Sequence, residues 1–266
     1  MTTQHRPWEV VTVRHGTRDT RRSEVFLNYP FYGEEDGPFT LDYFFWVLRR
    51  GDEAIVVDTG YSAEGAASRG RDVLIDPVDA LRRLGIDPAS GVPVVVTHAH
   101  YDHIGNLPAF TASPVHIAQA ELDFWRSDIA GRPLFSHFGD PLEVDELRRI
   151  EDEGRLRPFS GTVGIAEGVE LLEVGGHTPG QAMVSVATSD GRVLIASDAA
   201  HFVEELDRDM PFVSMADVPQ SYRVLDSIRG SDAAHVLTGH DAGTLATLEP
   251  LGDPLPGLAG VIGRQR

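Results

Sequence analysis

The chain of 266 residues contains no cysteine and no lysine, and each absence removes a class of chemistry. Without cysteine it has no disulfide, no thiolate metal ligand and no cysteine nucleophile. Without lysine, all 23 basic residues are arginines, and a Schiff base on a lysine amine is excluded. Any catalysis must therefore draw on histidine, carboxylates, hydroxyl groups or bound metal.

Positive charge and long apolar runs are also scarce. The 23 basic and 41 acidic residues give a net charge of −18, which repels phosphate backbones, so we expect no nucleic-acid partner. No apolar run reaches the length of a membrane span, and the first residues lack the pattern of a signal peptide. We expect a cytoplasmic protein with no membrane partner and a small-molecule substrate; a homodimer is compatible with this composition.

Short apolar runs alternate with helical patterns along the chain. Residues 41–48 and 54–57 predict a hairpin around a polar turn. Further strands are predicted at 92–96, 115–118, 169–174, 183–187, 193–196 and 235–238, and helices at 77–84, 120–126 and 219–228. Because strands and helices interleave and nothing divides the chain, we expect an α/β fold with a single domain over 1–266. The Gly-, Pro- and charge-rich segment 127–145 predicts an insertion or lid.

The most concentrated group of polar residues is the segment THAHYDHIGN, residues 97–106, directly after the apolar run 92–96. It holds His98, His100, Asp102 and His103 within six positions. Residues two apart in an extended chain point the same way, so His98 and His100 can reach one ion. Asp102 and His103 can reach a neighbouring ion. A polar loop that happens to be rich in histidine is the alternative interpretation.

Three more candidate ligands follow in matching contexts. They are His177 in VGGHTPGQ, Asp198 in LIASDAAH and His240 in VLTGHD, each a few residues past a predicted strand. An α/β scaffold can bring such strand-end loops together. Nitrogen and oxygen ligands without sulfur suit zinc, and also iron, manganese or cobalt.

With these residues the chain resembles the metallo-β-lactamase superfamily, from the hairpin at 41 to the loop at 239–241. The resemblance implies an αββα sandwich with two divalent metal ions, in the first place Zn²⁺, at one edge. The ligand sets it implies are His98, His100 and His177 for one ion and Asp102, His103 and His240 for the other, with Asp198 bridging them. For Asp58, in the segment Asp58-Thr59-Gly60, it implies a role in orienting the site; a turn or capping role stays open.

The resemblance also implies a reaction. A two-metal site of this family supports hydrolysis by a metal-bridging hydroxide. The context of Asp198 and His240 is similar to that of N-acyl-homoserine lactonases, so we expect a dinuclear hydrolase that opens a neutral, partly apolar lactone or a related small ester or cyclic amide. A glyoxalase II-like thioesterase and a mononuclear iron dioxygenase on the same fold are the alternatives. Asp102, Asp198 and His201 are the predicted catalytic residues.

His201 departs from the lactonase pattern. It stands three residues after Asp198, where those lactonases carry a tyrosine. We expect its imidazole to donate a hydrogen bond to the substrate carbonyl or the leaving alkoxide. A solvent-facing loop histidine is the alternative.

Other residues are candidates for the substrate pocket. Tyr29, Phe31 and Tyr32 lie around a proline and a glycine and could line an apolar pocket, or simply pack in the core. His137, within 127–145, is a candidate to face the site.

Overall fold

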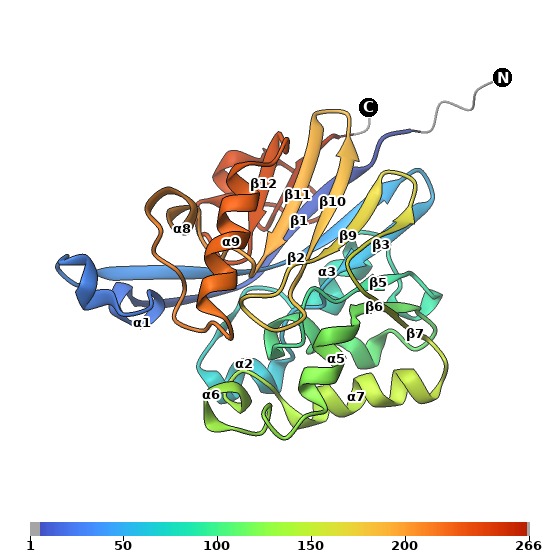
Figure 1. The fold of residues 1–266 in the computed structure, drawn as a ribbon. Coiled ribbons are helices and arrows are strands. Elements are labelled where there is room, and N and C mark those ends of the chain that lie inside the picture. The colour runs from blue at the N-terminus through green and yellow to red at the C-terminus, as the bar shows by residue number, and fades with distance from the viewer. Residues whose placement is uncertain (1–5, 265–266) are drawn as a thin grey trace.

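Two β-sheets pack face to face, and helices cover the outer face of each sheet (Figure 1). The computed structural model describes residues 6–264; residues 1–5 and 265–266 of the predicted domain lie outside the described residues. This four-layer arrangement is the predicted αββα sandwich in a single domain. None of the helices in the described part of the chain has both the length and the apolar character needed to cross a bilayer.

The larger sheet has nine strands in the order β13-β14-β1-β2-β3-β5-β6-β7, with β4 paired to β1. Its strands are β1 (Glu9–Arg21), β2 (Pro38–Arg50), β3 (Glu53–Val57), β4 (Asp72–Val73), β5 (Val94–Val95), β6 (Val115–Ala118), β7 (Leu156–Phe159), β13 (Glu249–Pro250) and β14 (Ala259–Ile262). The smaller sheet has the order β12-β11-β10-β9-β8. Its strands are β8 (Thr162–Ala166), β9 (Val169–Glu173), β10 (Ala182–Thr188), β11 (Gly191–Ser197) and β12 (His235–Thr238).

Helices are shorter and lie mostly on the outer faces. They are α1 (Arg22–Val25), α2 (Ala63–Arg69), α3 (Pro77–Arg83), α4 (Tyr101–Ile104), α5 (Gln119–Trp125), α6 (Pro133–Ser136), α7 (Pro141–Asp152), α8 (Val203–Arg208) and α9 (Val218–Arg229). α3, α5 and α7 cover the larger sheet, and α9 covers the smaller one. The start of α3 shows why the chain turns helical there: Asp76 accepts a hydrogen bond from the Asp79 amide at 3.0 Å, and Pro77 occupies the first turn.

The central strand β2 shows how the sequence builds two cores from one strand. Phe44, Trp46 and Leu48 face the smaller sheet, whereas Phe45 and Val47 face the helices. This alternation follows from the two-residue period of a strand. A strand covered on both faces reads as a continuous apolar run, and each such buried side chain contributes about 1.5–3 kcal/mol to folding.

Most predicted elements are confirmed within a few residues. The strand predicted at 92–96 is shortened to β5, which begins after Pro93 because proline has no N–H for a sheet hydrogen bond. The long strand β1 was not predicted, since the polar residues of its second half hide the pattern. The C-terminal strand β14, which pairs with β1, was not predicted either.

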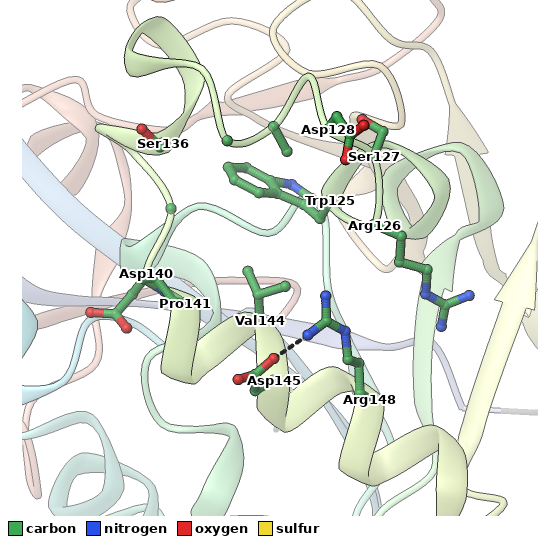
Figure 2. A pocket seen from close by; sticks show the side chains of 13 residues that line it. Trp125, Arg126, Ser127, Asp128, Ser136, Asp140, Pro141, Val144, Asp145 and Arg148 are labelled. Atoms are coloured by element: carbon green, nitrogen blue, oxygen red, sulfur yellow. Dashed lines mark hydrogen bonds and ion pairs between the residues drawn. The ribbon is translucent and has the colours of Figure 1, made fainter.

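The segment 127–145 contains α6 and the beginning of α7. A cavity of about 450 Å³ is lined by residues of this segment together with Trp125, Arg126 and, on α7, Arg148 (Figure 2). Whether the segment acts as a lid stays a prediction.

The strand directions bring five chain segments to one edge of the sandwich. β3 runs parallel to β5, and β11 runs parallel to β12. β9 is antiparallel to β10, which is antiparallel to β11, so β9 runs in the same direction as β11. The residues that follow β3, β5, β9, β11 and β12 therefore emerge at carboxyl ends of strands, the edge at which α/β proteins bind ligands.

Gly105 ends the segment after β5 and fixes it against the segment after β3. Its amide donates to the Gly60 carbonyl at 3.0 Å, and a Cβ at this position would lie 2.4 Å from the Ser62 amide nitrogen.

We expect Gly105→Ala to lower the free energy of unfolding, measured by urea denaturation, by about 1–3 kcal/mol, because the backbone must move to make room. Gly37→Ala is the control, since a Cβ there meets nothing within 4 Å. Equal stability of the two variants would contradict this packing.

Candidate metal centre

Eight buried histidine and aspartate side chains converge at this edge: His98, His100, Asp102, His103, His177, Asp198, His201 and His240. They include all seven residues predicted as ligands, together with His201. Among the described residues they form four overlapping triplets whose ligand atoms lie within 4.8 Å of one another, so each triplet could hold a metal ion.

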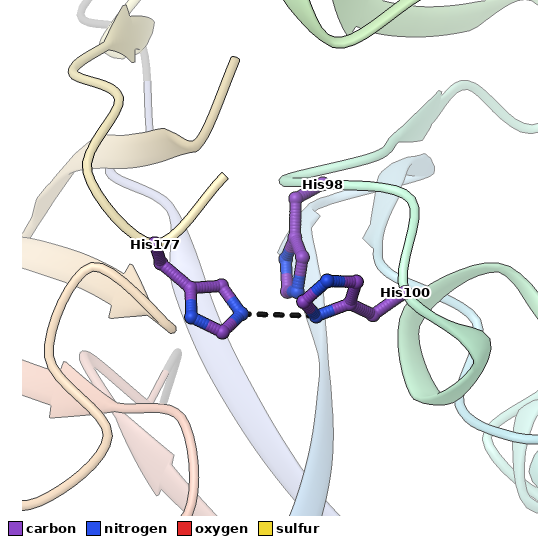
Figure 3. A group of neighbouring side chains, drawn as sticks. All are labelled: His98, His100 and His177. Atoms are coloured by element: carbon purple, nitrogen blue, oxygen red, sulfur yellow. Dashed lines mark hydrogen bonds between the residues drawn. The ribbon is translucent and has the colours of Figure 1, made fainter. Parts of the chain in front are cut away.

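One triplet comprises His98, His100 and His177. His98 and His100 follow β5, and His177 lies on the loop between β9 and β10, so the two sheets each contribute (Figure 3). The Nε2 atom of His177 lies 2.9 Å from Nδ1 of His100, and the three rings meet edge to face. The predicted grouping of these three histidines is present in the fold.

A second triplet comprises Asp102, His103 and His240. Asp102 and His103 lie on α4, one turn long, and His240 follows β12. The Oδ2 atom of Asp102 lies 3.7 Å from Nε2 of His103 and 3.7 Å from Nε2 of His240. This is the second predicted grouping.

Asp198 lies between the two triplets, directly after β11. Its Oδ2 is 3.2 Å from Nε2 of His240, 3.5 Å from Nε2 of His177 and 3.8 Å from Nε2 of His98. Its Oδ1 is 3.5 Å from Nε2 of His103. One carboxylate thus faces histidines of both triplets, which is the geometry that a bridging ligand requires.

The Nδ1 atoms of three cluster histidines form hydrogen bonds with residues outside the cluster. Nδ1 of His177 donates to the Ser214 carbonyl at 2.7 Å, and Nδ1 of His240 donates to the Asp42 carbonyl at 2.9 Å. Nδ1 of His103 donates to the Asp58 carboxylate at 2.8 Å. Each donation leaves the Nε2 lone pair of that ring directed into the cluster, which is how partners of metal-binding histidines fix the tautomer.

Several atoms in the cluster fit a bound cation. Nε2 of His98, of His103 and of His201 and Oδ1 of Asp198 are buried and have no hydrogen-bond partner among residues 6–264. Buried polar atoms without a partner cost about 1–3 kcal/mol each, and a bound ion is one of the explanations for them. The donor set of nitrogen and oxygen atoms suits a divalent ion such as zinc.

Burial and the neighbouring groups set the protonation of the rings. Burial, assisted by the nearby His103 and His100, holds the pKa of His98 well below its usual value. Burial, assisted by His201 and His100, does the same to the pKa of His177. Both imidazoles are therefore neutral at pH 7, the form in which histidine binds metal.

His201 lies behind Asp198 and is fully buried. Its Nε2 is 3.3 Å from Oδ2 of Asp198, and its Nδ1 is 3.2 Å from the Glu205 carboxylate. Burial lowers the pKa of His201, but Asp198 and Glu205 outweigh burial and raise it to about 9. The ring also stacks on Phe212, with centroids 4.0 Å apart. The imidazole of His201 therefore lies in the protein interior, against the carboxylate of Asp198.

Glu121 connects the loops that carry three of the histidines, and no sequence pattern predicted this role. Its Oε1 accepts from the Ala99 amide at 2.9 Å and the Trp125 indole at 2.8 Å. Its Oε2 accepts from the Thr178 hydroxyl at 2.6 Å and the Gly180 amide at 3.0 Å. Burial raises the pKa of this carboxyl, although the four hydrogen bonds oppose the rise. The carboxylate thereby joins the loop of His98 and His100 to the loop of His177.

A cavity of about 260 Å³ opens above the cluster. It is lined by His100, Asp102, His177, Asp198 and His240 at its base, and by Arg18, Glu24, Leu41, Tyr43, Arg71, Tyr101, His137, Phe138, Phe212 and Val213 around them. His137 lines the cavity, in agreement with the prediction. The prediction for Tyr29, Phe31 and Tyr32 was wrong: none lines this cavity, Tyr29 packs in a core cluster near α1, and Phe31 is 83% exposed.

Residues 41–240 match the Metallo-beta-lactamase superfamily. The chain belongs to this superfamily. Membership implies that the cluster binds divalent metal, in line with the triplets described above. The matched range begins in β2 and ends at His240, so it contains every residue of the cluster.

Relatives in this superfamily include lactonases. The chain is 26% identical over 167 residues to an N-acyl homoserine lactonase from Bacillus sp, and the match covers 62% of this chain and 61% of that protein. The chain thus spans about three fifths of the length of this curated relative. The fold superposes on a quorum-quenching N-acyl homoserine lactone lactonase with a TM-score of 0.75 at 20% identity, covering 94% of this chain and 98% of the other.

A second solved structure is an N-acyl homoserine lactone hydrolase with the product N-hexanoyl-L-homoserine bound at its catalytic metal centre. Its TM-score is 0.74 at 19% identity, and the superposition covers 92% of this chain and 97% of the other. At these identities the two structures show that the fold is shared.

We expect Glu121→Gln to weaken the metal centre. Each oxygen of this carboxylate accepts one backbone N–H, so in either orientation the new amide turns its NH₂ group toward one of them. An unpaired buried N–H costs about 1–3 kcal/mol. The variant should unfold at lower temperature and release zinc at a lower chelator concentration. Asp123→Asn, at an exposed position on the same helix, is the control; identical behaviour of the two variants would remove the organising role from Glu121.

Proposed function

We propose that this chain is a dinuclear metal-dependent hydrolase that opens a lactone or a related small ester or cyclic amide. The observation that carries the proposal is the position of Asp198 between two ligand triplets, at the base of a small cavity. The lactonase relatives support the same reaction class. The proposal therefore rests on the geometry of this site, with the relatives as support.

In this proposal His98, His100 and His177 would hold one ion, Asp102, His103 and His240 would hold the other, and Asp198 would serve both. Zinc is the proposed metal because the donors are nitrogen and oxygen; iron, manganese and cobalt also suit them. Two bound divalent ions would polarise the scissile carbonyl and lower the pKa of water.

The chain's own residues supply the rest of the site. Asp102 and Asp198 both line the cavity, and in this proposal their carboxylates accept a proton as water attacks the carbonyl. Phe138, Phe212 and Val213 give one part of the wall an apolar surface that excludes water from the bound ring.

The role proposed for His201 follows from its burial. Donation to a substrate would require its Nε2 to reach the cavity, but this nitrogen faces Asp198 at 3.3 Å, and His201 is absent from the cavity lining within residues 6–264. We therefore propose that His201, held by Glu205, positions the carboxylate of Asp198. Direct donation by His201 stays the prediction made from the sequence.

Elemental analysis tests the metal count. Protein purified without chelator should contain close to two metal ions per chain. Asp198→Ala should lower the occupancy of both sites, because this carboxylate faces both triplets, whereas His240→Ala should mainly empty the second. His235→Ala, on β12 outside the cluster, should keep both ions. A ratio of one that added metal does not change would exclude the dinuclear site and favour a mononuclear enzyme.

Proton release in weakly buffered solution tests the reaction. Lactones and small esters should acidify the medium when mixed with the zinc-, manganese- or cobalt-loaded protein, because hydrolysis yields a carboxylic acid that ionises. Cyclic amides are followed by chromatography of the product, because the amine they release takes up the proton. Asp198→Ala and metal-stripped protein should be inactive. Turnover of phosphodiesters or thioesters with no turnover of any lactone would show that the proposed bond is wrong.

A further inference from the structure

One of the arginines that line the cavity above the cluster has no ion-pair partner among residues 6–264, and the carboxylate of Asp102 acts on its charge only from a greater distance. Two arginines line this cavity, Arg18 and Arg71. Arg18 forms an ion pair with Glu24 at 3.0 Å, and Glu24 also accepts from the Thr20 hydroxyl. Arg71 forms no ion pair with any carboxylate within residues 6–264. The guanidinium of Arg71 is therefore available to pair with an anionic ligand that enters the cavity.

The guanidinium of Arg71 is held in place from behind. Its Nε donates to the Tyr101 hydroxyl at 3.0 Å, and its Nη1 donates to the Arg69 carbonyl at 2.6 Å. A guanidinium carries five N–H donors, so these two bonds leave three, including both on Nη2. A half-buried arginine that is already ordered loses little freedom when it binds an anion.

The backbone of Arg71 is fixed as well. Gly70, at φ 61°, ends α2, and the Arg71 amide donates to the Ala66 carbonyl at 2.9 Å. The next two residues form β4, which pairs with β1. The side chain therefore projects from a rigid junction and not from a free loop.

The other charges of the cavity leave this cation in excess. Asp102, Asp198, His100, His177 and His240 belong to the ligand triplets, where bound divalent ions would offset the carboxylates; His137 lines the cavity outside the triplets. Glu24 is already paired with Arg18. The remaining wall is apolar or aromatic, with Leu41, Tyr43, Phe138 and Phe212. In a protein of net charge −18, such a positive pocket selects for an anion of its own size.

We propose that the substrate carries a carboxylate, which Arg71 binds while the bond to be hydrolysed lies at the metal centre. The inference rests on the proposed function and changes the substrate expected from the sequence, a neutral lactone, to a small acidic lactone or ester. A cavity of about 260 Å³ fits a compact molecule of this kind. The planar fork of arginine matches the two oxygens of a carboxylate.

Calorimetric titration of the zinc-loaded protein with glutarate and with its neutral monoamide tests the inference without any turnover. Glutarate presents one carboxylate to the metal centre and a second to Arg71, whereas the monoamide keeps only the first. The wild-type protein should bind glutarate about tenfold or more tightly than the monoamide, the gain expected for a charge-assisted pair. Arg71→Gln should bind the two alike, and Arg71→Lys should retain part of the preference.

Arg18→Gln is the matched control, because that arginine lines the same cavity but already has a partner; this variant should keep the preference for glutarate. A wild-type protein that does not distinguish the two ligands overturns the inference. So does an Arg71→Gln variant that weakens both ligands equally, since Arg71 would then only support Tyr101.

Hydrolysis separates this inference from the proposed function. A γ-lactone bearing a carboxylate should be hydrolysed with a kcat/KM about tenfold or more above that of the matching carboxamide, and Arg71→Gln should remove the difference through KM. If glutarate is preferred but no lactone or ester reacts, the proposed function fails and the carboxylate site stands. If both lactones react equally, the proposed function stands and the carboxylate site at Arg71 fails.

Discussion

The buried carboxylate of Asp58 is the point on which the architecture of the site depends. It accepts hydrogen bonds from the Thr97 amide at 2.8 Å, from the Thr97 hydroxyl at 2.7 Å and from Nδ1 of His103 at 2.8 Å, and the Ser197 hydroxyl lies 3.5 Å away. A fully buried carboxylate is tolerated only when donors surround it in this way. These donors come from the ends of β5 and β11 and from α4, so a single side chain connects both sheets with a cluster histidine. Of the two roles left open by the sequence, these contacts fit the one that orients the site.

The backbone around the carboxylates of Asp58 and Asp198 has little room to relax. Asp58 at φ 60° and Ser197 at φ 47° both adopt the left-handed region, which costs a residue other than glycine about 1–3 kcal/mol. At Gly239 a Cβ would lie 2.2 Å from Oδ1 of Asp198. Asp198 therefore stands between a strained residue and a glycine that cannot be replaced without moving it. The protein backbone therefore fixes the position of the Asp198 carboxylate.

How far the sequence could predict the site depends on where the information lies. His98, His100, Asp102 and His103 are neighbours in the chain, so their pattern is visible without a structure. Glu121 stands 22 positions after Ala99 and 57 before Thr178, and as one glutamate on an amphipathic helix it has no pattern of its own. Such contacts form only when distant segments pack together in the folded protein, so no local sequence pattern predicts them.

The same distinction explains the outcomes for the fold and the cavity. Apolar runs on strands buried on both faces, such as β2 and β11, are strong signals, and they were predicted. β1 extends past the sheet into an exposed ribbon, where its residues turn polar and the signal fades. Tyr29 and Phe31 were expected near the site because aromatics favour pockets, yet neither lines the cavity: Tyr29 packs in a core cluster beside it, and Phe31 is exposed. Composition predicts a tendency to be buried but not the location.

The cluster also joins the two halves of the sandwich. His98, His100, Asp102 and His103 follow β5 of the larger sheet, whereas His177, Asp198 and His240 follow strands of the smaller sheet. Every triplet except the one of His177, Asp198 and His201 draws on both sheets. An ion held by such a triplet is a cross-link between the sheets, and its binding free energy adds to the free energy of unfolding. The packing of the two sheets and the occupancy of the site are then one coupled equilibrium, and residues that only hold the loops, such as Glu121 and Asp58, contribute to both.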